Sequence, residues 1–380
     1  MIAALFSIAL IQWVLVQNIF GQGQTTLSKP LHLNWHIEID SLTNLTPAVS
    51  DGKIYIALNA GNVVSLNTAD GSLYWKSDIG GEISATPVAD SRGVYIASES
   101  HPTTTHGGTF YQATGALRII GGASGVTLWM RTLPSPIRGD LVSNETAIFG
   151  CTSDGYLYAI KKMSGEIAWV KHSSSGFNPS PVLSGGNLYI CDREGNIFSI
   201  DQNTGQMLWH YRTRKSLRTP ITITDGVLYS GSNDGSVYAI NLSTRQLRWR
   251  VRTGAAVQSL LPAGKCLLTT SLDNFVYCLS PENGDKLWKR QMAGRVEAQP
   301  LVLGDGVLLS PLAGDECVVL SLEDGREVNS IYVGEDSNSG TSPLLLGNFL
   351  LLTTRKGLYA FSNEINQSIK DIGGASPSLH

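Results

Sequence analysis

Residues 195–211 read GNIFSIDQNTGQMLWHY, and residues 235–250 read GSVYAINLSTRQLRWR. In both stretches a short run of alternating polarity leads into a turn, and the run after the turn carries a tryptophan. The same signature recurs along the chain and gives a series of tryptophans, at Trp35, Trp75, Trp129, Trp169, Trp209, Trp249 and Trp288. A period near 40 residues is typical of a stack of similar supersecondary units, none of which can bury its apolar face alone.

Each unit contains four short strand signals joined by turns that carry glycine, such as Asp51-Gly52 and Asp234-Gly235. The first of these strands occurs eight times, starting near residues 46, 85, 138, 180, 219, 258, 299 and 342. The tryptophan strand follows only seven of the units, but an extra copy, LNWHIEI at 33–39, precedes the first. The sequence therefore predicts an all-β fold over residues 31–362: an eight-bladed β-propeller of four-stranded antiparallel blades, in which the N-terminal strand closes the ring.

A small residue lies ten positions before most of the tryptophans, as in Ser65 and Trp75 or Ala159 and Trp169. This pattern resembles the tryptophan-docking repeat of the pyrroloquinoline quinone (PQQ)-type propellers. That family includes quinoprotein alcohol dehydrogenases and, closer in size to this chain, the non-catalytic outer-membrane assembly propeller BamB. The resemblance implies that the seven tryptophans dock blade against blade. Three departures mark irregular places: Ile119 at the small position of blade 2, Asn329 at the tryptophan position of blade 7, and Arg138-Gly139-Asp140 at the start of blade 3.

The two ends of the chain differ from the repeats. Residues 2–20 are apolar and uncharged, and Gly21 and Gly23 suit a signal peptidase. We expect residues 1–23 to be a signal peptide, with an uncleaved membrane anchor as the alternative, and residues 363–380 to be a flexible tail. Both readings predict an extracytoplasmic protein, either periplasmic or secreted. The five cysteines show no metal-ligand spacing, and we expect them to be small buried hydrophobes.

The resemblance raises the hypothesis of an enzyme, because the quinoprotein dehydrogenases hold PQQ against an adjacent cysteine pair beside a calcium site. This chain has no adjacent cysteines, and most of its acidic residues lie in turns where Asp-Gly is needed for the backbone. The sequence therefore predicts no catalytic, cofactor-binding or metal-binding residues, and no PQQ.

Function is then expected in the loops. The loops after the tryptophan strand and those between the second and third strands of each blade should share one face around the central funnel. The candidate ligand or partner residues on that face are Arg138, Asp140, Arg214, Lys215, Arg218, Arg295, Glu297, His101, His106 and Tyr111.

The leading prediction is a non-catalytic, extracytoplasmic protein-binding scaffold that is similar to BamB. A formal net charge of −3 argues against a nucleic-acid partner. Membrane contact is expected only through residues 2–20, if they are retained, and the ring is expected to be monomeric. The alternatives are a PQQ-dependent oxidoreductase and a propeller that senses a small anion through the basic run around Arg214 and Arg218.

Overall fold

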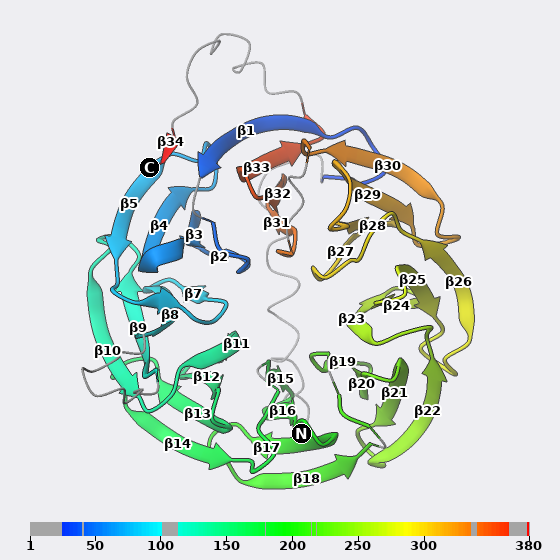
Figure 1. Ribbon diagram of the computed structural model, residues 1–380, viewed down its shortest axis with the longest axis horizontal. Coiled ribbons are helices and arrows are strands. Elements are labelled where there is room, and N and C mark those ends of the chain that lie inside the picture. The colour runs from blue at the N-terminus through cyan, green and yellow to red at the C-terminus, as the bar shows by residue number, and fades with distance from the viewer. Residues whose placement is uncertain are drawn as a thin grey trace, which may run out of the picture.

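The computed structural model describes residues 25–39, 42–100, 113–178, 180–213, 215–217, 219–335, 340–364 and 378–379. These residues form eight antiparallel sheets arranged as blades around a central axis (Figure 1). The predicted all-β, eight-bladed propeller is confirmed, and helical structure in the described residues is limited to the short 3₁₀ turn η1 (Asn59–Gly61).

Four concentric layers of strands build the ring. The inner strands are β2 (Ala48–Ser50), β7 (Val88–Asp90), β11 (Ile137–Ser143), β15 (Val182–Ser184), β19 (Thr222–Thr224), β23 (Val257–Ala263), β27 (Leu301–Leu303) and β31 (Leu344–Leu346). The second strands are β3 (Lys53–Ala57), β8 (Gly93–Glu99), β12 (Ala147–Thr152), β16 (Asn187–Cys191), β20 (Val227–Gly231), β24 (Cys266–Ser271), β28 (Gly306–Leu309) and β32 (Phe349–Thr353).

The third strands are β4 (Asn62–Asn67), β9 (Gly115–Gly121), β13 (Tyr156–Lys161), β17 (Asn196–Asp201), β21 (Ser236–Asn241), β25 (Phe275–Leu279), β29 (Glu316–Ser321) and β33 (Gly357–Ser362). The outer strands are β5 (Leu73–Asp78), β10 (Thr127–Leu133), β14 (Ile167–His172), β18 (Met207–Arg212), β22 (Gln246–Arg252), β26 (Lys286–Gln291), β30 (Glu327–Tyr332) and β1 (His32–Ile39). In blade 2 the short β6 (Glu82–Ile83) also pairs with β8.

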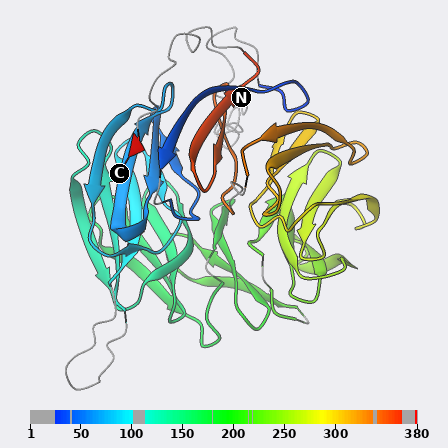
Figure 2. The ribbon, with the colours of Figure 1, turned by 45° about the horizontal axis from the view of Figure 1, so that its top comes forward.

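The ring is closed by its N-terminal strand, as the strand count predicts. β1 pairs antiparallel with β33 of the last blade, and Trp35 lies opposite Ala360. The blue and red ends of the chain therefore lie side by side in Figures 1 and 2. On the other edge of β1, Ser378–Leu379 form β34, which pairs in parallel with Glu38 and Ile39. These two residues of the tail, which we expected to be flexible, therefore form a short strand.

A row of three side chains across each sheet explains the ten-residue spacing. In blade 1, Tyr55 of β3 lies opposite Ser65 of β4, and Ser65 lies opposite Trp75 of β5. The central side chain is small and buried, so the two rings can approach over it to a centroid distance of 5.9 Å. Blade 3 repeats the row with Phe149, Ala159 and Trp169. The spacing is thus a property of one hairpin, and it places a large aromatic pair in blades 1 to 5, whereas leucine replaces the second-strand aromatic in blades 6 to 8.

The tryptophans then bind the following blade. The indole N–H of Trp75 donates to the carbonyl of Gly122 at 3.0 Å, and the ring lies against Gly125, where an added Cβ would meet it at 2.9 Å. Gly125 also has a φ of 69°, so both the turn and the indole require glycine there. The same bond recurs for Trp129, Trp169, Trp249 and Trp288. Trp35 lies against Gly71 of blade 1, which completes the circle.

Blade 7 lacks the tryptophan, and residues 25–31 take its place. Asn329 lies opposite Val319, at the docking position, and its amide donates to the carbonyls of Leu27 and Lys29, both at 2.8 Å. Leu27 is fully buried and packs among side chains of blades 7 and 8. The amide of Asn363 donates to the carbonyls of Thr26 and Pro30. The chain therefore contributes a second N-terminal element to closure, ahead of β1.

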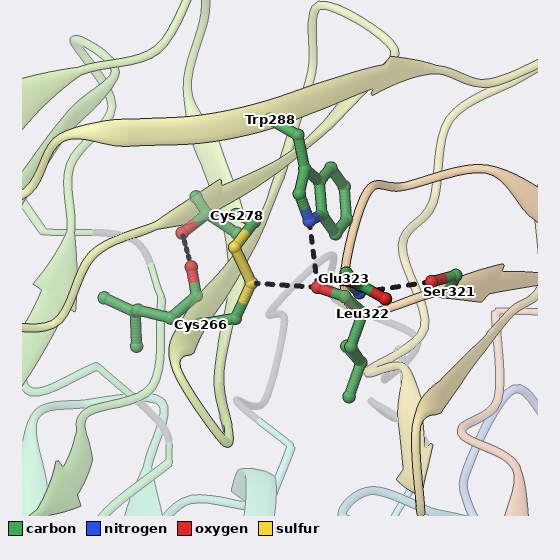
Figure 3. The surroundings of a disulfide bond; sticks show 8 residues. Cys266, Cys278, Trp288, Ser321, Leu322 and Glu323 are labelled. Carbon is green, nitrogen blue, oxygen red and sulfur yellow. Dashed lines mark hydrogen bonds between the residues drawn. A yellow bond between two sulfur atoms is a disulfide. The ribbon is translucent and has the colours of Figure 1, made fainter.

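The cysteines require a correction. Three of them, Cys151, Cys191 and Cys317, are buried thiols outside any disulfide, as expected, but Cys266 and Cys278 form a disulfide. The two lie on the neighbouring strands β24 and β25, with their Cα atoms 5.1 Å apart. Figure 3 shows the bond beside Trp288, whose indole donates to the carbonyl of Leu322 in blade 7. The sequence did not predict the disulfide because Cys278 occupies the small position opposite Trp288, and that position alone explains a small residue there.

Candidate functional site

The face expected to carry function is formed as the repeat predicts, and we call it the funnel face. It consists of the loops that follow the outer strands together with the loops between second and third strands. A backbone hydrogen bond joins the two kinds of loop in most blades: Ile79 donates to Gly61, Thr213 to Gly195, Thr253 to Gly235, Met292 to Asn274 and Val333 to Asp315. These loops therefore lie together on one side of the ring.

Arg138 and Asp140 lie on β11 next to the channel and hold three blades together. The guanidinium of Arg138 makes a bidentate pair with Glu99 of blade 2, at 2.9 and 2.5 Å. Asp140 accepts a hydrogen bond from Ser180 of blade 4 at 2.6 Å. The pairing of β11 with β12 shifts register between Arg138 and Val142, so the irregular start of blade 3 forms a bulge. Both side chains are already engaged within the fold.

Lys215, Arg295 and Glu297 are exposed on loops of the funnel face. The backbones of Lys215 and Arg295 are held in place: the Thr213 hydroxyl donates to the carbonyl of Lys215 at 2.7 Å, and the Leu312 N–H donates to the carbonyl of Arg295 at 2.8 Å. Free side chains on an anchored backbone suit contact with a partner. The remaining predicted residues, His101, His106, Tyr111, Arg214 and Arg218, lie outside the described residues, as does most of the long loop between β8 and β9.

Two aspartates that the sequence analysis did not single out organise this face, Asp192 and Asp273. Asp192 is buried and accepts from the backbone of Glu194 and Asn196, from the Asn196 amide and from the Ser175 hydroxyl, at 2.7–3.0 Å. Its carboxylate thus joins the loop after the outer strand of blade 3 to the loop between β16 and β17. Asp192 and Asp273 both lie in turns between a second and a third strand, and some aspartates in the same kind of turn in other blades are exposed, so the sequence did not distinguish them.

Asp273 does the same in blade 6. It accepts from the backbone of Gly254 at 2.8 Å and from the hydroxyl of Tyr277 at 2.5 Å. Burial and this hydrogen bond raise the pKa of Tyr277 to about 12. The network keeps the phenol neutral and the loop between β22 and β23 in place.

The channel itself is apolar on one side. A cavity of about 500 Å³ lies against the inner strands of blades 1 to 4, lined by Ala48, Val49, Pro87, Val88, Ala89, Leu141, Val142, Ser143, Pro181, Val182 and Leu183. The lining contains no charged side chain and one hydroxyl, so it lacks the converging polar groups that orient a small polar ligand.

The residues present do not fit the cofactor site of the quinoprotein dehydrogenases. The five cysteines, at 151, 191, 266, 278 and 317, include no adjacent pair, and the single described disulfide lies within blade 6. Within the described ranges, no group of three or more His, Cys, Asp or Glu side chains converges as a metal site would require. Over the same ranges, no helix is both long enough and apolar enough to cross a bilayer.

The comparisons with known proteins agree with the repeat. A family model described as "Outer membrane protein assembly factor BamB" matches residues 26–101, 97–179, 154–265 and 258–364. No curated protein matches the sequence significantly.

Solved structures with the same fold include both kinds of PQQ-type propeller. BamB from Moraxella catarrhalis superposes with a TM-score of 0.70 at 16% identity, covering 88% of this chain and 100% of its own. A quinohemoprotein alcohol dehydrogenase from Comamonas testosteroni gives 0.69 at 12% identity, covering 94% and 79%. Sqt1 from Saccharomyces cerevisiae gives 0.69 at 13% identity, covering 88% and 99%. At these identities the likeness concerns the fold alone. Because the family model matches almost the whole ring, the chain belongs to the PQQ-repeat propeller family that is described by BamB.

Proposed function

We propose that this protein is a non-catalytic scaffold outside the cytoplasm that binds other proteins through its funnel face, in the manner of a BamB-like propeller. The observation that carries the proposal is the state of the polar groups on that face. Arg138, Asp140, Asp192 and Asp273 bond to neighbouring loops. Lys215, Arg295 and Glu297 instead point outward from anchored loops. Loops that are held rigidly and that carry exposed charged side chains favour recognition of the surface of another protein.

The chain's cysteines support a location outside the cytoplasm. Disulfides such as Cys266–Cys278 form and persist in oxidising compartments and are rare in the cytosol. The apolar residues 2–20 agree with export, whether or not they are removed. Protein partners are the class that this proposal requires, and neither PQQ nor a metal is part of it.

The proposal is tested by photo-crosslinking in intact cells of the source organism. A photoreactive residue is placed at Lys215 or at Arg295, and, as the matched control, at Asp305, which is exposed on the opposite turn between β27 and β28. We expect discrete protein adducts from the first two positions and none from the third. Adducts that form equally from all three positions, or from none, would contradict a partner-binding funnel face.

The enzyme alternative is tested with purified protein incubated with PQQ and calcium. An artificial electron acceptor reports any oxidation of alcohols or sugars. We expect no dye reduction above that of heat-denatured protein. Dye reduction that saturates with substrate would contradict the non-catalytic proposal, whatever the crosslinking shows.

A further inference from the structure

Cationic side chains are concentrated on two neighbouring outer strands, at the edge of the ring rather than on its funnel face. β22 carries Arg248, Arg250 and Arg252, and β26 carries Lys286, Lys289 and Arg290; we call these six residues the basic rim. Neither strand contains an acidic residue. The other six outer strands together carry only four lysines and arginines: Lys76, Arg131, Lys171 and Arg212.

The basic rim is exposed and is not neutralised within the described part of the chain. All six residues are solvent-exposed. Arg252 donates to the carbonyl of Asp234, and Lys286 and Lys289 lie over the rings of Tyr277 and Phe275. None of the six forms an ion pair with a carboxylate among the described residues, whereas cations elsewhere do, as in Arg212 with Glu194 and Lys161 with Glu166. Arg252 attracts the carboxylate of Asp234 without pairing with it. The nearest acidic residues in the sequence, Glu282 and Asp285, lie on the turn before β26.

The strand beneath the cations offers backbone groups as well as charge. β22 is the last strand of its sheet, so its outer edge has no strand partner in the described structure. Arg250 and Arg252 alternate with the buried or half-buried Trp249 and Val251, whereas Arg248 lies at a register shift between Leu247 and Trp249. Alternate residues of a strand repeat about every 6.6–6.8 Å, which is the repeat at which an extended partner would present every second side chain. Figure 1 shows β22 and β26 following one another along the rim.

We propose that the basic rim is a docking site for an extended acidic segment of another protein, which adds as a strand to the free edge of β22. Backbone hydrogen bonds hold the segment, and carboxylates on alternate residues pair with Arg250 and Arg252, while Arg248 at the register shift adds to the local positive charge. The same cations repel basic strands, including the equivalent edge of a second copy of this chain, which protects the edge from aggregation. A lipid surface fits less well, because it supplies no backbone groups for a strand edge. The inference rests on the proposed function only in that the partner is a protein.

The probe is a fluorescently labelled ten-residue peptide in which threonine and glutamate alternate. A second peptide of the same composition carries its five glutamates in one block. A third repeats the alternating sequence with an N-methyl group on every residue, which removes the backbone donors from both edges. Fluorescence anisotropy with the full-length purified protein measures affinity, and vesicles containing anionic phospholipid provide the membrane comparison.

We expect the alternating peptide to bind, and the block and N-methylated peptides to bind at least about tenfold more weakly. Arg250→Glu should weaken binding about tenfold or more, whereas the matched change Arg212→Glu, on blade 4, should leave it within about twofold. Both variants should show the wild-type melting curve, because both side chains are exposed.

Four results would overturn the inference. They are no peptide binding, equal weakening by Arg250→Glu and Arg212→Glu, binding to vesicles alone, and equal affinity for the block peptide. These failures leave the funnel-face crosslinks unchanged, so they are distinguishable from failure of the proposed function.

Discussion

The side-chain amide of Asn329 donates to the carbonyl oxygen of Leu27 at 2.8 Å, across 302 residues of sequence. This bond stands where the other blades place an indole, and Leu27 supplies the buried apolar group that the indole would supply. The junction of blades 7 and 8 is therefore completed by the N-terminal segment.

Removing either partner should loosen that junction by different amounts. Leu27→Ala leaves a cavity among fully buried side chains and should lower the free energy of unfolding by about 2–5 kcal/mol. Asn329→Ala leaves the Leu27 carbonyl without its donor, while the Lys29 carbonyl keeps a longer bond from Asn363, and the change should cost about 1–3 kcal/mol. Urea denaturation measures both effects, with Leu33→Ala, an exposed position on β1, as the control. If Leu27→Ala is as mild as the control, residues 25–31 do not seal the ring.

Blade 5 has an arginine where the other docking turns have glycine, and replacing it should stabilise the protein. Arg245 has a φ of 59° and donates its backbone N–H to Asn241, as Gly205 does to Asp201. Among the described residues, Trp209 lacks the indole bond to the next blade that five docking tryptophans make, and the indole N–H of Trp35 is also without a partner. Arg245→Gly should therefore raise the free energy of unfolding by about 1 kcal/mol.

The reciprocal change is Gly205→Ala, whose Cβ would meet the Trp169 ring at 2.7 Å. It should destabilise the protein by more than Arg245→Gly stabilises it. Equal and small effects at both positions in thermal melts would show that the turn conformation, rather than the indole, sets the requirement for glycine.

The cysteines give a count that can be checked. Protein secreted into an oxidising compartment and unfolded without reductant should titrate three thiols, and five after reduction. While folded it should titrate almost none, because burial raises the pKa of Cys317 to about 11 and that of Cys191 to about 12. Reduction should also lower stability by about 3 kcal/mol. Five thiols before reduction would contradict the disulfide.

Tyr277 predicts a loss of stability at alkaline pH. Its pKa is raised to about 12 by burial and by the hydrogen bond to Asp273, so folding favours the neutral phenol. Its contribution to stability is complete below the ordinary tyrosine pKa of about 10 and is lost as the pH rises toward 12. The difference in unfolding free energy between wild type and Tyr277→Phe should therefore shrink from pH 9 to pH 11.5. Tyr332→Phe, at an exposed position, serves as control. A constant difference across that range would refute the assignment.

The sequence predicted the architecture well because each blade repeats one row of side chains. The positions of Trp75, Ser65 and their equivalents were readable as a period, and the surplus strand at Trp35 predicted the closure. The missing tryptophan at Asn329 was also readable in the sequence. That Leu27 fills the space of the missing indole was not, since Leu27 lies outside every repeat and only the closed ring brings it to blade 7.

The functional surfaces were less predictable for the opposite reason. Arg138 and Asp140 were readable as the irregular start of blade 3, yet their partners, Glu99 and Ser180, lie in other blades and have no shared motif. The disulfide joins residues twelve apart whose spacing has no counterpart in the other blades. The basic rim was visible as RQLRWRVR and KLWKRQ, but only the ring makes these two stretches neighbours.

The central structural claim is that residues 25–39 close the ring. The most direct measurement compares the thermal unfolding of the chain without these residues, alone and with a synthetic peptide of residues 25–39. We predict that the truncated chain loses its cooperative transition or aggregates, because blade 8 has an open edge and the junction with blade 7 is empty. The peptide should restore a single transition. A truncated chain that melts as the parent does, with no effect of the peptide, would contradict the account.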